Sequence, residues 1–162
     1  MPQLAVRPAT QDDLPIILAF IRELAEYEKL SHEVVATEEQ LRATLFGERP
    51  VAEVILGTLD GTLAGFAVFF ANYSTFLAKP GLYLEDLYVR PHARGHGLGR
   101  ELLEYLARLA VERKWGRLEW RVLDWNAPSI GFYKTLGAEP LDDWTVFRLT
   151  GQALKRVAGV AL

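Results

Sequence analysis

The sequence predicts a mixed α/β domain in which a single sheet is covered by helices on both faces. Segments with apolar residues at helical spacing alternate with short apolar runs typical of strands, in the order β-α-α-β-β-β-α-β-α-β. The length of 162 residues suits one domain with a sizeable core, which we expect to span residues 1–162. Half of the residues are apolar and 24% are charged, a balance that excludes disorder as the default.

The N-terminal part predicts a strand followed by two helices. Residues 3–7 alternate weakly as a strand, and apolar residues then recur at helical spacing from Leu14 to about Tyr27. Thr37 and Gln40 form a capping-box pattern, in which each side chain bonds the other residue's backbone N–H. A second, short helix is therefore expected from this cap to Gly47.

The middle of the chain predicts three strands. Apolar runs at 51–59 and 63–70 flank Asp60-Gly61, a pair preferred in two-residue hairpin turns because both central residues need positive φ. These two runs are expected to pair as antiparallel strands. A third strand is expected at 82–89, with the sequence LYLEDLYV.

The C-terminal part predicts two helices that alternate with two strands, before a short helical tail. From Gly97 onward the apolar residues form one helical face, and a strand is expected at 117–123. Asn126 is a suitable N-cap for the next helix, and Gly137 is placed to end it. A last strand is expected at 144–149.

The most specific local motif is the glycine-rich string RGHGLG at 94–99, between a strand and a helix. Glycine lets the backbone approach a ligand closely, and free N–H groups at a helix N-terminus attract anions such as a phosphate or pyrophosphate. The string lacks the third glycine of a dinucleotide fingerprint and the Gly-Lys-Ser/Thr of a nucleotide-triphosphate loop. On these residues alone, a tight connection that binds nothing remains an equal alternative.

The pattern Arg94-x-x-Gly97-x-Gly99 resembles the acetyl-coenzyme A signature of the GCN5-related N-acetyltransferases (GNAT). Four more segments, VRPATQDD, RELAEYEKL, LYLEDLYV and DWNAPSIGFYKTLGA, resemble the diamine (spermidine/spermine) acetyltransferase branch in the same order. The resemblance implies a GNAT-type mixed, mostly antiparallel sheet flanked by helices on both faces. It also implies a homodimeric enzyme that transfers acetyl from acetyl-CoA to a small primary amine by direct attack in a ternary complex. The lack of cysteine and of a signal-like N-terminal segment favours a cytoplasmic location.

The resemblance also assigns residues to the acetyl-CoA site. The backbone of Leu87, Tyr88 and Val89 would contact the acetyl and pantetheine portion. The pyrophosphate would be held by the loop residues Arg94, Gly95, His96, Gly97, Leu98, Gly99 and Arg100. The far side would be lined by Asn126, Pro128 and Ser129, although helix capping alone explains the first two. Tyr133 would protonate the departing thiolate, although its pattern alone favours ordinary core packing.

Glu85 and Asp86 are adjacent carboxylates in an apolar strand, so one of them is expected to enter a covered region. An ion pair with Arg90 or Arg121 would be a purely structural explanation. The resemblance implies instead that Glu85 deprotonates the amine through water. It places further residues against the substrate, namely Tyr27, Glu28, Asp86 and Trp144. The diamine enzymes carry an acidic residue and a tryptophan where this chain has Ser74 and Phe76, a departure that favours a smaller amine.

Other function classes find less support. The chain has no cysteine, which excludes a cysteine acyl-enzyme, and its three histidines lack the spacing of a metal site. A net charge of −3 gives no general reason to bind nucleic acid or an anionic membrane. The helix arginines alternate with glutamates, which predicts an ion-paired, solvated face. A secretory signal and a transmembrane span are not expected. A protein lysine or N-terminal acetyltransferase and a noncatalytic coenzyme A-binding domain remain alternatives.

Overall fold

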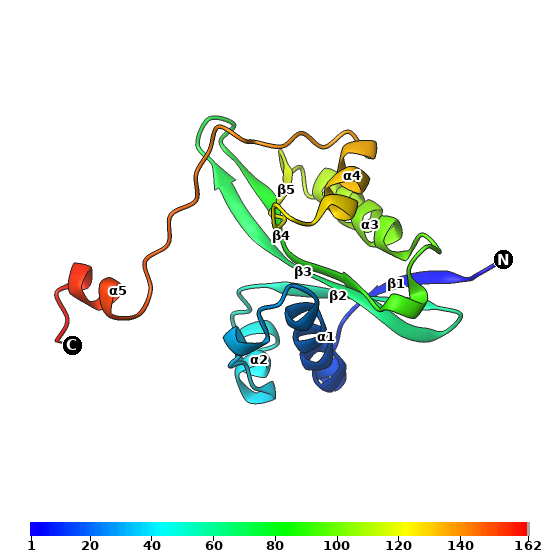
Figure 1. Ribbon diagram of the computed structural model, residues 1–162, viewed down its shortest axis with the longest axis horizontal. Helices are drawn as coiled ribbons and strands as arrows, with labels where there is room; N and C mark the ends of the chain where they lie inside the picture. The colour runs from blue at the N-terminus through cyan, green and yellow to red at the C-terminus, as the bar shows by residue number, and fades with distance from the viewer. Residues whose placement is uncertain (162) are drawn as a thin grey trace. The chain divides into compact units, whose positions relative to one another are not determined.

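The computed structural model describes residues 1–161, which form two compact units. The first unit runs from Met1 to Leu123, and the second begins at Asp124. The first unit holds the whole sheet, and the second holds two short helices, α4 (Ala127–Thr135) and α5 (Gly151–Ala158) (Figure 1). No helix among the described residues is both long enough and apolar enough to cross a membrane.

The first unit is built on a five-stranded sheet whose strands lie in chain order. The strands are β1 (Leu4–Pro8), β2 (Glu53–Leu59), β3 (Thr62–Ser74), β4 (Lys79–Val89) and β5 (Leu118–Trp120). The first four pair antiparallel, whereas β5 lies parallel to β4. Asp60 and Gly61, with φ of 51° and 82°, form the turn between β2 and β3, which confirms the predicted hairpin.

Helices cover both faces of this sheet, as predicted. Helices α1 (Leu14–Tyr27) and α2 (Glu38–Leu45) lie on one face, and α3 (Leu98–Glu112) lies on the other (Figure 1). The α1 side of the core consists of Ile17, Phe20, Leu24, Val54, Leu56, Phe66 and Tyr88. Helix α3 covers the opposite face with a buried stripe that includes Leu98, Leu102 and Leu106, at the helical spacing seen in the sequence.

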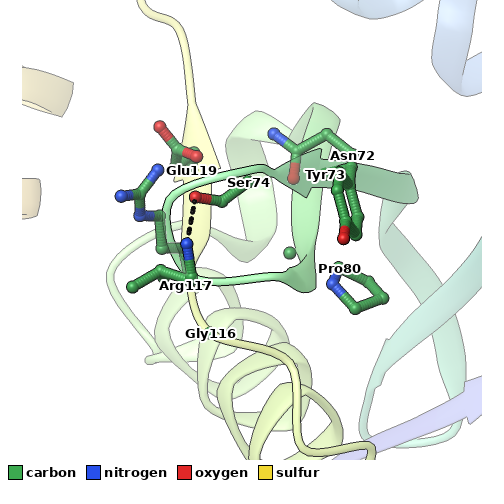
Figure 2. A pocket seen from close by; sticks show the side chains of 9 residues that line it. Asn72, Tyr73, Ser74, Pro80, Gly116, Arg117 and Glu119 are labelled. Atoms are coloured by element: carbon green, nitrogen blue, oxygen red, sulfur yellow. Dashed lines mark hydrogen bonds between the residues drawn. The ribbon is translucent and has the colours of Figure 1, made fainter.

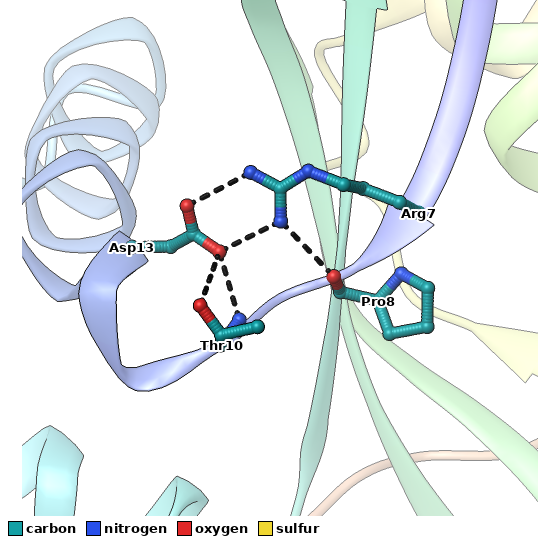
Figure 3. Close-up of polar contacts among 4 residues, drawn as sticks. All are labelled: Arg7, Pro8, Thr10 and Asp13. Atoms are coloured by element: carbon teal, nitrogen blue, oxygen red, sulfur yellow. Dashed lines mark hydrogen bonds and ion pairs between the residues drawn. The ribbon is translucent and has the colours of Figure 1, made fainter.

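A polar cluster fixes the entry into α1 (Figure 3). The Asp13 carboxylate accepts hydrogen bonds from the Thr10 backbone N–H and from the Arg7 guanidinium, with the nearest distance in each case 2.8 Å. The hydrogen bond from Arg7 is the main reason that the pKa of Asp13 falls to about 2, and burial opposes it. The cluster therefore ties β1 to the start of α1.

Two local predictions about the helices are confirmed. Thr37 and Gln40 form the capping box of α2, which ends at Leu45, two residues before the predicted Gly47. The outer face of α3 carries the expected ion pairs, Arg100 with Glu104 at 2.8 Å and Arg108 with Glu101 at 3.6 Å. Both pairs are exposed, so they keep the helix soluble more than they stabilise it.

The predicted strand at 144–149 is wrong, because these residues form neither helix nor strand. The strand predicted at 117–123 is reduced to the three residues of β5. Alternating apolar residues give a segment the propensity for a strand, but a strand also needs a neighbour to share its ladder of hydrogen bonds. The described part of the chain provides no such neighbour for 144–149.

Candidate active site

The glycine-rich loop leads directly into α3, as the sequence predicted. Gly95 and Gly97 have φ of 81° and 88°, in the left-handed region that favours glycine. Gly97 is the N-cap residue of α3 and supplies no side chain to bond the first N–H groups of the helix. A Cβ at Gly95 would meet nothing within 4 Å, and a Cβ at Gly99 would meet only Val89 Cγ2, at 3.8 Å. The loop therefore leaves room for an anion at a helix N-terminus.

The end of β4 offers a second surface for ligand contacts. Strand β5 pairs with β4 only from Leu82 to Leu84, whereas β3 pairs along it as far as Val89. From Glu85 onward, one edge of β4 therefore has no ladder partner among the described residues. Along such an edge, alternate backbone N–H groups are left for other acceptors, such as a carbonyl oxygen.

A β-bulge separates the two adjacent carboxylates of β4. Val68 of β3 lies opposite Asp86, but the next residue, Phe69, lies opposite Leu84, so Glu85 is the extra residue. Glu85 is exposed and Asp86 is half-buried, so one carboxylate is covered, as expected. The alternative of an ion pair with Arg90 or Arg121 does not hold. Glu23 binds the Arg90 guanidinium at 2.9 and 3.0 Å, and within residues 1–161 neither carboxylate of β4 forms an ion pair with Arg121.

The covered carboxylate lies in a negative environment. Burial first, and then the charges of Glu85 and Glu28, raise the pKa of Asp86 to about 7. Burial and the charge of Glu85 likewise raise the pKa of Glu28, which follows the last residue of α1. Within residues 1–161, no ion pair to the Asp86 carboxylate is found, and no hydrogen bond is among the causes that shift its pKa. A bound cation would reduce the electrostatic repulsion among the carboxylates of Glu28, Glu85 and Asp86.

A polar framework that the sequence did not reveal joins α1 to the end of β4. Glu23 accepts hydrogen bonds from the Tyr88 hydroxyl and from Arg90, and Arg90 lies 4.8 Å over the Phe20 ring. The hydrogen bond from Arg90 is the main cause that lowers the pKa of Glu23. The sequence did contain one indication of this framework. Glu23 lies three residues after Phe20, so both side chains share a face of the amphipathic helix α1. The framework holds Tyr88, whose backbone was predicted to contact the cofactor.

The remaining cofactor candidates lie in the second unit. Asn126 is buried, and its side chain accepts a hydrogen bond from the Ser129 N–H at 3.4 Å, which confirms it as the N-cap of α4. Pro128 lies in the first turn, as predicted. Tyr133 is half-buried on the same helix, with its ring centroid 5.7 Å from that of Phe132. Trp144 lies outside any helix or strand and is exposed.

Ser74 and Phe76, which depart from the diamine acetyltransferase pattern, lie at the turn of the β3–β4 hairpin. Ser74 ends β3, accepts a hydrogen bond from the Leu77 N–H at 3.2 Å and borders a shallow hollow beside Arg117 and Glu119 (Figure 2). At about 3.3 Å per residue, Ser74 is about 20 Å along β3 from Val68, the residue opposite Asp86. Phe76, in the connecting turn, is almost fully exposed. Neither residue is a neighbour of the acidic cluster.

The histidines do not assemble into a metal site. His32 lies beside Glu33, while His92 and His96 lie on the exposed loop that precedes α3. Across the residues that the structure describes, no group of three or more potential ligands could hold a metal ion.

Comparisons with known proteins give a consistent set of relatives. Residues 19–138 match the model of the acetyltransferase (GNAT) family. The chain is 40% identical to a thialysine N-epsilon-acetyltransferase of Sus scrofa, over 98% of this chain and 99% of that protein. It is 34% identical to an L-ornithine N5-acetyltransferase of Arabidopsis thaliana, over 94% of this chain and 86% of that protein.

A solved structure supports the same fold. An integron cassette protein from the mobile metagenome of V. cholerae superposes with a TM-score of 0.79 at 27% identity, covering 96% of this chain and 97% of that one.

Proposed function

The chain belongs to the acetyltransferase (GNAT) family and is an N-acetyltransferase, and from this premise we propose that its acceptor is a small cationic amine. The acetyl group would pass from acetyl-coenzyme A to a terminal primary amine of a lysine-like amino acid or a diamine. The names of the relatives support this class, since thialysine and ornithine each carry such an amine. All of residues 1–162 would serve as one catalytic domain.

The observation that carries this proposal is the half-buried Asp86, which lies near the charges of Glu85 and Glu28 and has no ion-paired cation within residues 1–161. A carboxylate that is partly shielded from water and lies beside other carboxylates is stabilised by a paired cation or by protonation. An acceptor with a second positive charge would pair with Asp86 and Glu28 while its reactive nitrogen approaches the cofactor. Complementary charge also raises the rate of capture.

The residues present fit acetyl-coenzyme A. The open space at Gly95 and Gly99 and the uncapped N-terminus of α3 suit the pyrophosphate, with Arg94 at the start of the loop and Arg100 in the first turn of α3. The unpaired edge of β4 near Leu87 and Val89 suits the amide-rich pantetheine portion. Asn126, Pro128 and Ser129 would line the far side of the cofactor.

The proposed chemistry is direct transfer, with Glu85 and Tyr133 as the acid–base pair. An alkylamine with a pKa near 10.4 is neutral in only about one molecule in 2,500 at pH 7, so a base must remove its proton. Glu85, exposed beside the covered Asp86, would do so through water. A backbone N–H near Leu87 or Val89 would stabilise the developing oxyanion, and Tyr133 would protonate the departing sulfur.

The test is a thiol-release assay with acetyl-coenzyme A and a series of acceptors at fixed salt. Lysine-like amines and short diamines should match or exceed spermine in kcat/KM, and monoamines without a second charge should be poorer. Glu28→Gln should lower kcat/KM about five-fold for the doubly charged acceptors only, since it removes one pairing charge. Glu26→Gln, the same change at an exposed site on α1, is the matched control.

Each other outcome points to a different activity. A strong preference for spermine would restore a polyamine substrate. Turnover of peptides alone would favour a protein lysine or N-terminal acetyltransferase. If the protein binds coenzyme A but releases no thiol with any acceptor, it is a noncatalytic coenzyme A-binding domain.

We further propose that the enzyme is a cytoplasmic homodimer that acts on dissolved amines rather than on nucleic acid or a membrane surface. The net charge of −3 supports the choice of partner, because polyanionic surfaces attract basic proteins. Exposed apolar side chains near the C-terminus support self-association, including Trp144, Val146 and Phe147.

A further inference from the structure

The Arg94 side chain contacts two segments of the first unit besides its own loop. Its Nε–H donates a hydrogen bond to the backbone oxygen of Val89, the last residue of β4, at 2.8 Å. Its guanidinium carbon lies 5.7 Å from the centroid of the Tyr88 ring and 5.1 Å from that of Tyr27, the last residue of α1. One side chain therefore links the glycine-rich loop to both β4 and α1.

The charge of Arg94 is not neutralised by an acid. Within residues 1–161, no carboxylate forms an ion pair with its exposed guanidinium. Arg90, four residues earlier, is by contrast held on two nitrogens by Glu23. Arg94 is instead held by a backbone carbonyl and by the faces of two phenol rings, contacts that leave its positive charge in place.

The Tyr27 ring lies at the acceptor end of the proposed site. Tyr27 is followed by Glu28, and Lys29, with φ of 61°, turns the chain away from the helix. Burial and the charge of Glu85 raise the pKa of Glu28, so Glu28 belongs to the same electrostatic environment as the carboxylates of β4. The ring that Arg94 contacts therefore belongs to the residue directly before an acidic residue of the proposed acceptor site.

We propose that Arg94 is a positioning residue that couples the coenzyme loop to the acceptor end of α1 through the ring of Tyr27. The effect on the amine rests on the proposed function. The contacts of Arg94 with the loop and with Tyr27 do not depend on it. When an anion binds at the loop, Arg94 is held between that anion and the Tyr27 ring, so the end of α1 is ordered as well. Reciprocally, ordering of α1 by an amine favours the anion-binding position of the loop.

Lysine cannot replace arginine in this role. The planar guanidinium donates from Nε to Val89 while its face stacks on an aromatic ring, and an ammonium group cannot do both at once. The Tyr27 hydroxyl is not needed for the stacking, so phenylalanine should retain the link. These two conditions define the variants that test it.

The first measurement is calorimetric titration of the full chain with coenzyme A alone. Tyr27→Leu should weaken binding about two- to five-fold although Tyr27 lies outside the loop, and Tyr27→Phe should bind like the parent. Arg94→Lys should weaken binding at least as much. The double variant Arg94→Lys/Tyr27→Leu should be no weaker than Arg94→Lys alone, because both changes break one link.

The second measurement separates the KM values for the two substrates. Arg94→Lys should raise the KM for the amine as well as for acetyl-coenzyme A, with kcat changed less than either. Arg100→Lys, in the first turn of α3 and ion-paired to Glu104, should alter only the KM for acetyl-coenzyme A. An unchanged coenzyme A affinity in Tyr27→Leu, or multiplicative effects in the double variant, would overturn the link. If no amine is accepted at all, the proposed function fails while the titrations still decide whether the link exists.

Discussion

At the scale of single residues, Asp86 has the most informative environment in the first unit. Its pKa is raised from the ordinary 3.8 to about 7 by burial and by two neighbouring carboxylates. The unfolded chain releases this proton near pH 4 and the folded chain near pH 7. Between these values the folded state binds more protons, so this group makes the protein less stable as pH rises.

Asp86→Asn should therefore stabilise the fold at pH 8, on the order of 2 kcal/mol, and have little effect near pH 4. It should also depress kcat/KM for doubly charged amines, because it removes the group that pairs with them. Urea unfolding of parent and variant at pH 4, 6 and 8 measures the first effect. Asp13, whose pKa of about 2 lies below its ordinary 3.8, also makes stability fall as the pH approaches 4, but both proteins carry it, so its effect cancels from the difference.

A pH-independent difference between parent and Asp86→Asn would contradict the raised pKa. A saturating diamine should, in addition, reduce the pH dependence of the parent, since an ammonium ion stabilises the ionised carboxylate.

At the scale of elements, the junction of the glycine-rich loop and α3 determines how closely a phosphate can approach. Gly99→Val should lower coenzyme A affinity at least ten-fold, because its side chain would occupy the space at the helix N-terminus. The fold itself should tolerate the change. A Cβ at this position meets only Val89 Cγ2, at 3.8 Å, and Gly99 does not have a positive φ.

Calorimetry gives the affinity and thermal unfolding checks the fold. Gly99→Ala adds a smaller side chain than Gly99→Val, so its affinity for coenzyme A should lie between those of the parent and Gly99→Val. Gly97 is a poorer site for this test, because its φ of 88° strains any substituent regardless of the ligand. If Gly99→Val is well folded and binds coenzyme A as tightly as the parent, the pyrophosphate does not bind at this loop.

At the scale of the whole molecule, the apolar surface near the C-terminus predicts self-association. Phe147 is 91% exposed and Trp144 is 76% exposed, in a segment that forms no helix or strand. Several large apolar side chains exposed within one short segment, here Trp144, Val146 and Phe147, are typical of an interaction surface. Light scattering should therefore report about twice the chain mass of 18.2 kDa. Phe147→Glu should shift the mass toward the monomer, because a charge cannot be buried unpaired.

Phe76→Glu provides a matched control, since Phe76 is equally exposed but lies in the turn between β3 and β4. A parent protein that is monomeric at every concentration would reject the homodimer. A shift with Phe76→Glu and not with Phe147→Glu would place the interface on the hairpin instead.

Much of the fold was predictable because its signals are local. Helical spacing, the capping box at Thr37 and the Asp60-Gly61 turn each depend on a few consecutive residues. The motif Arg94-x-x-Gly97-x-Gly99 is equally local, so its place before α3 was expected and is confirmed. The family was also recognisable from motifs in chain order, and the comparisons confirm it.

Other features depend on residues that are distant in the chain. Alternation along β4 predicted that one of Glu85 and Asp86 is covered, but the bulge that selects Asp86 depends on the register with β3. The contacts of Arg94 with Tyr27, and of Glu23 with Arg90, join segments more than sixty residues apart. The same reason explains the failed strand at 144–149, because a strand is completed only by a neighbour.

By itself, the sequence determined the order of elements as far as α4 and the glycine-rich loop before α3, since each follows from a few consecutive residues, and its motifs identified the family. Only the tertiary structure decided which carboxylate is covered, which arginine is neutralised by Glu23 and which remains charged beside the loop. Burial and pairing are properties of the assembled fold, because they depend on what the other segments bring to each side chain.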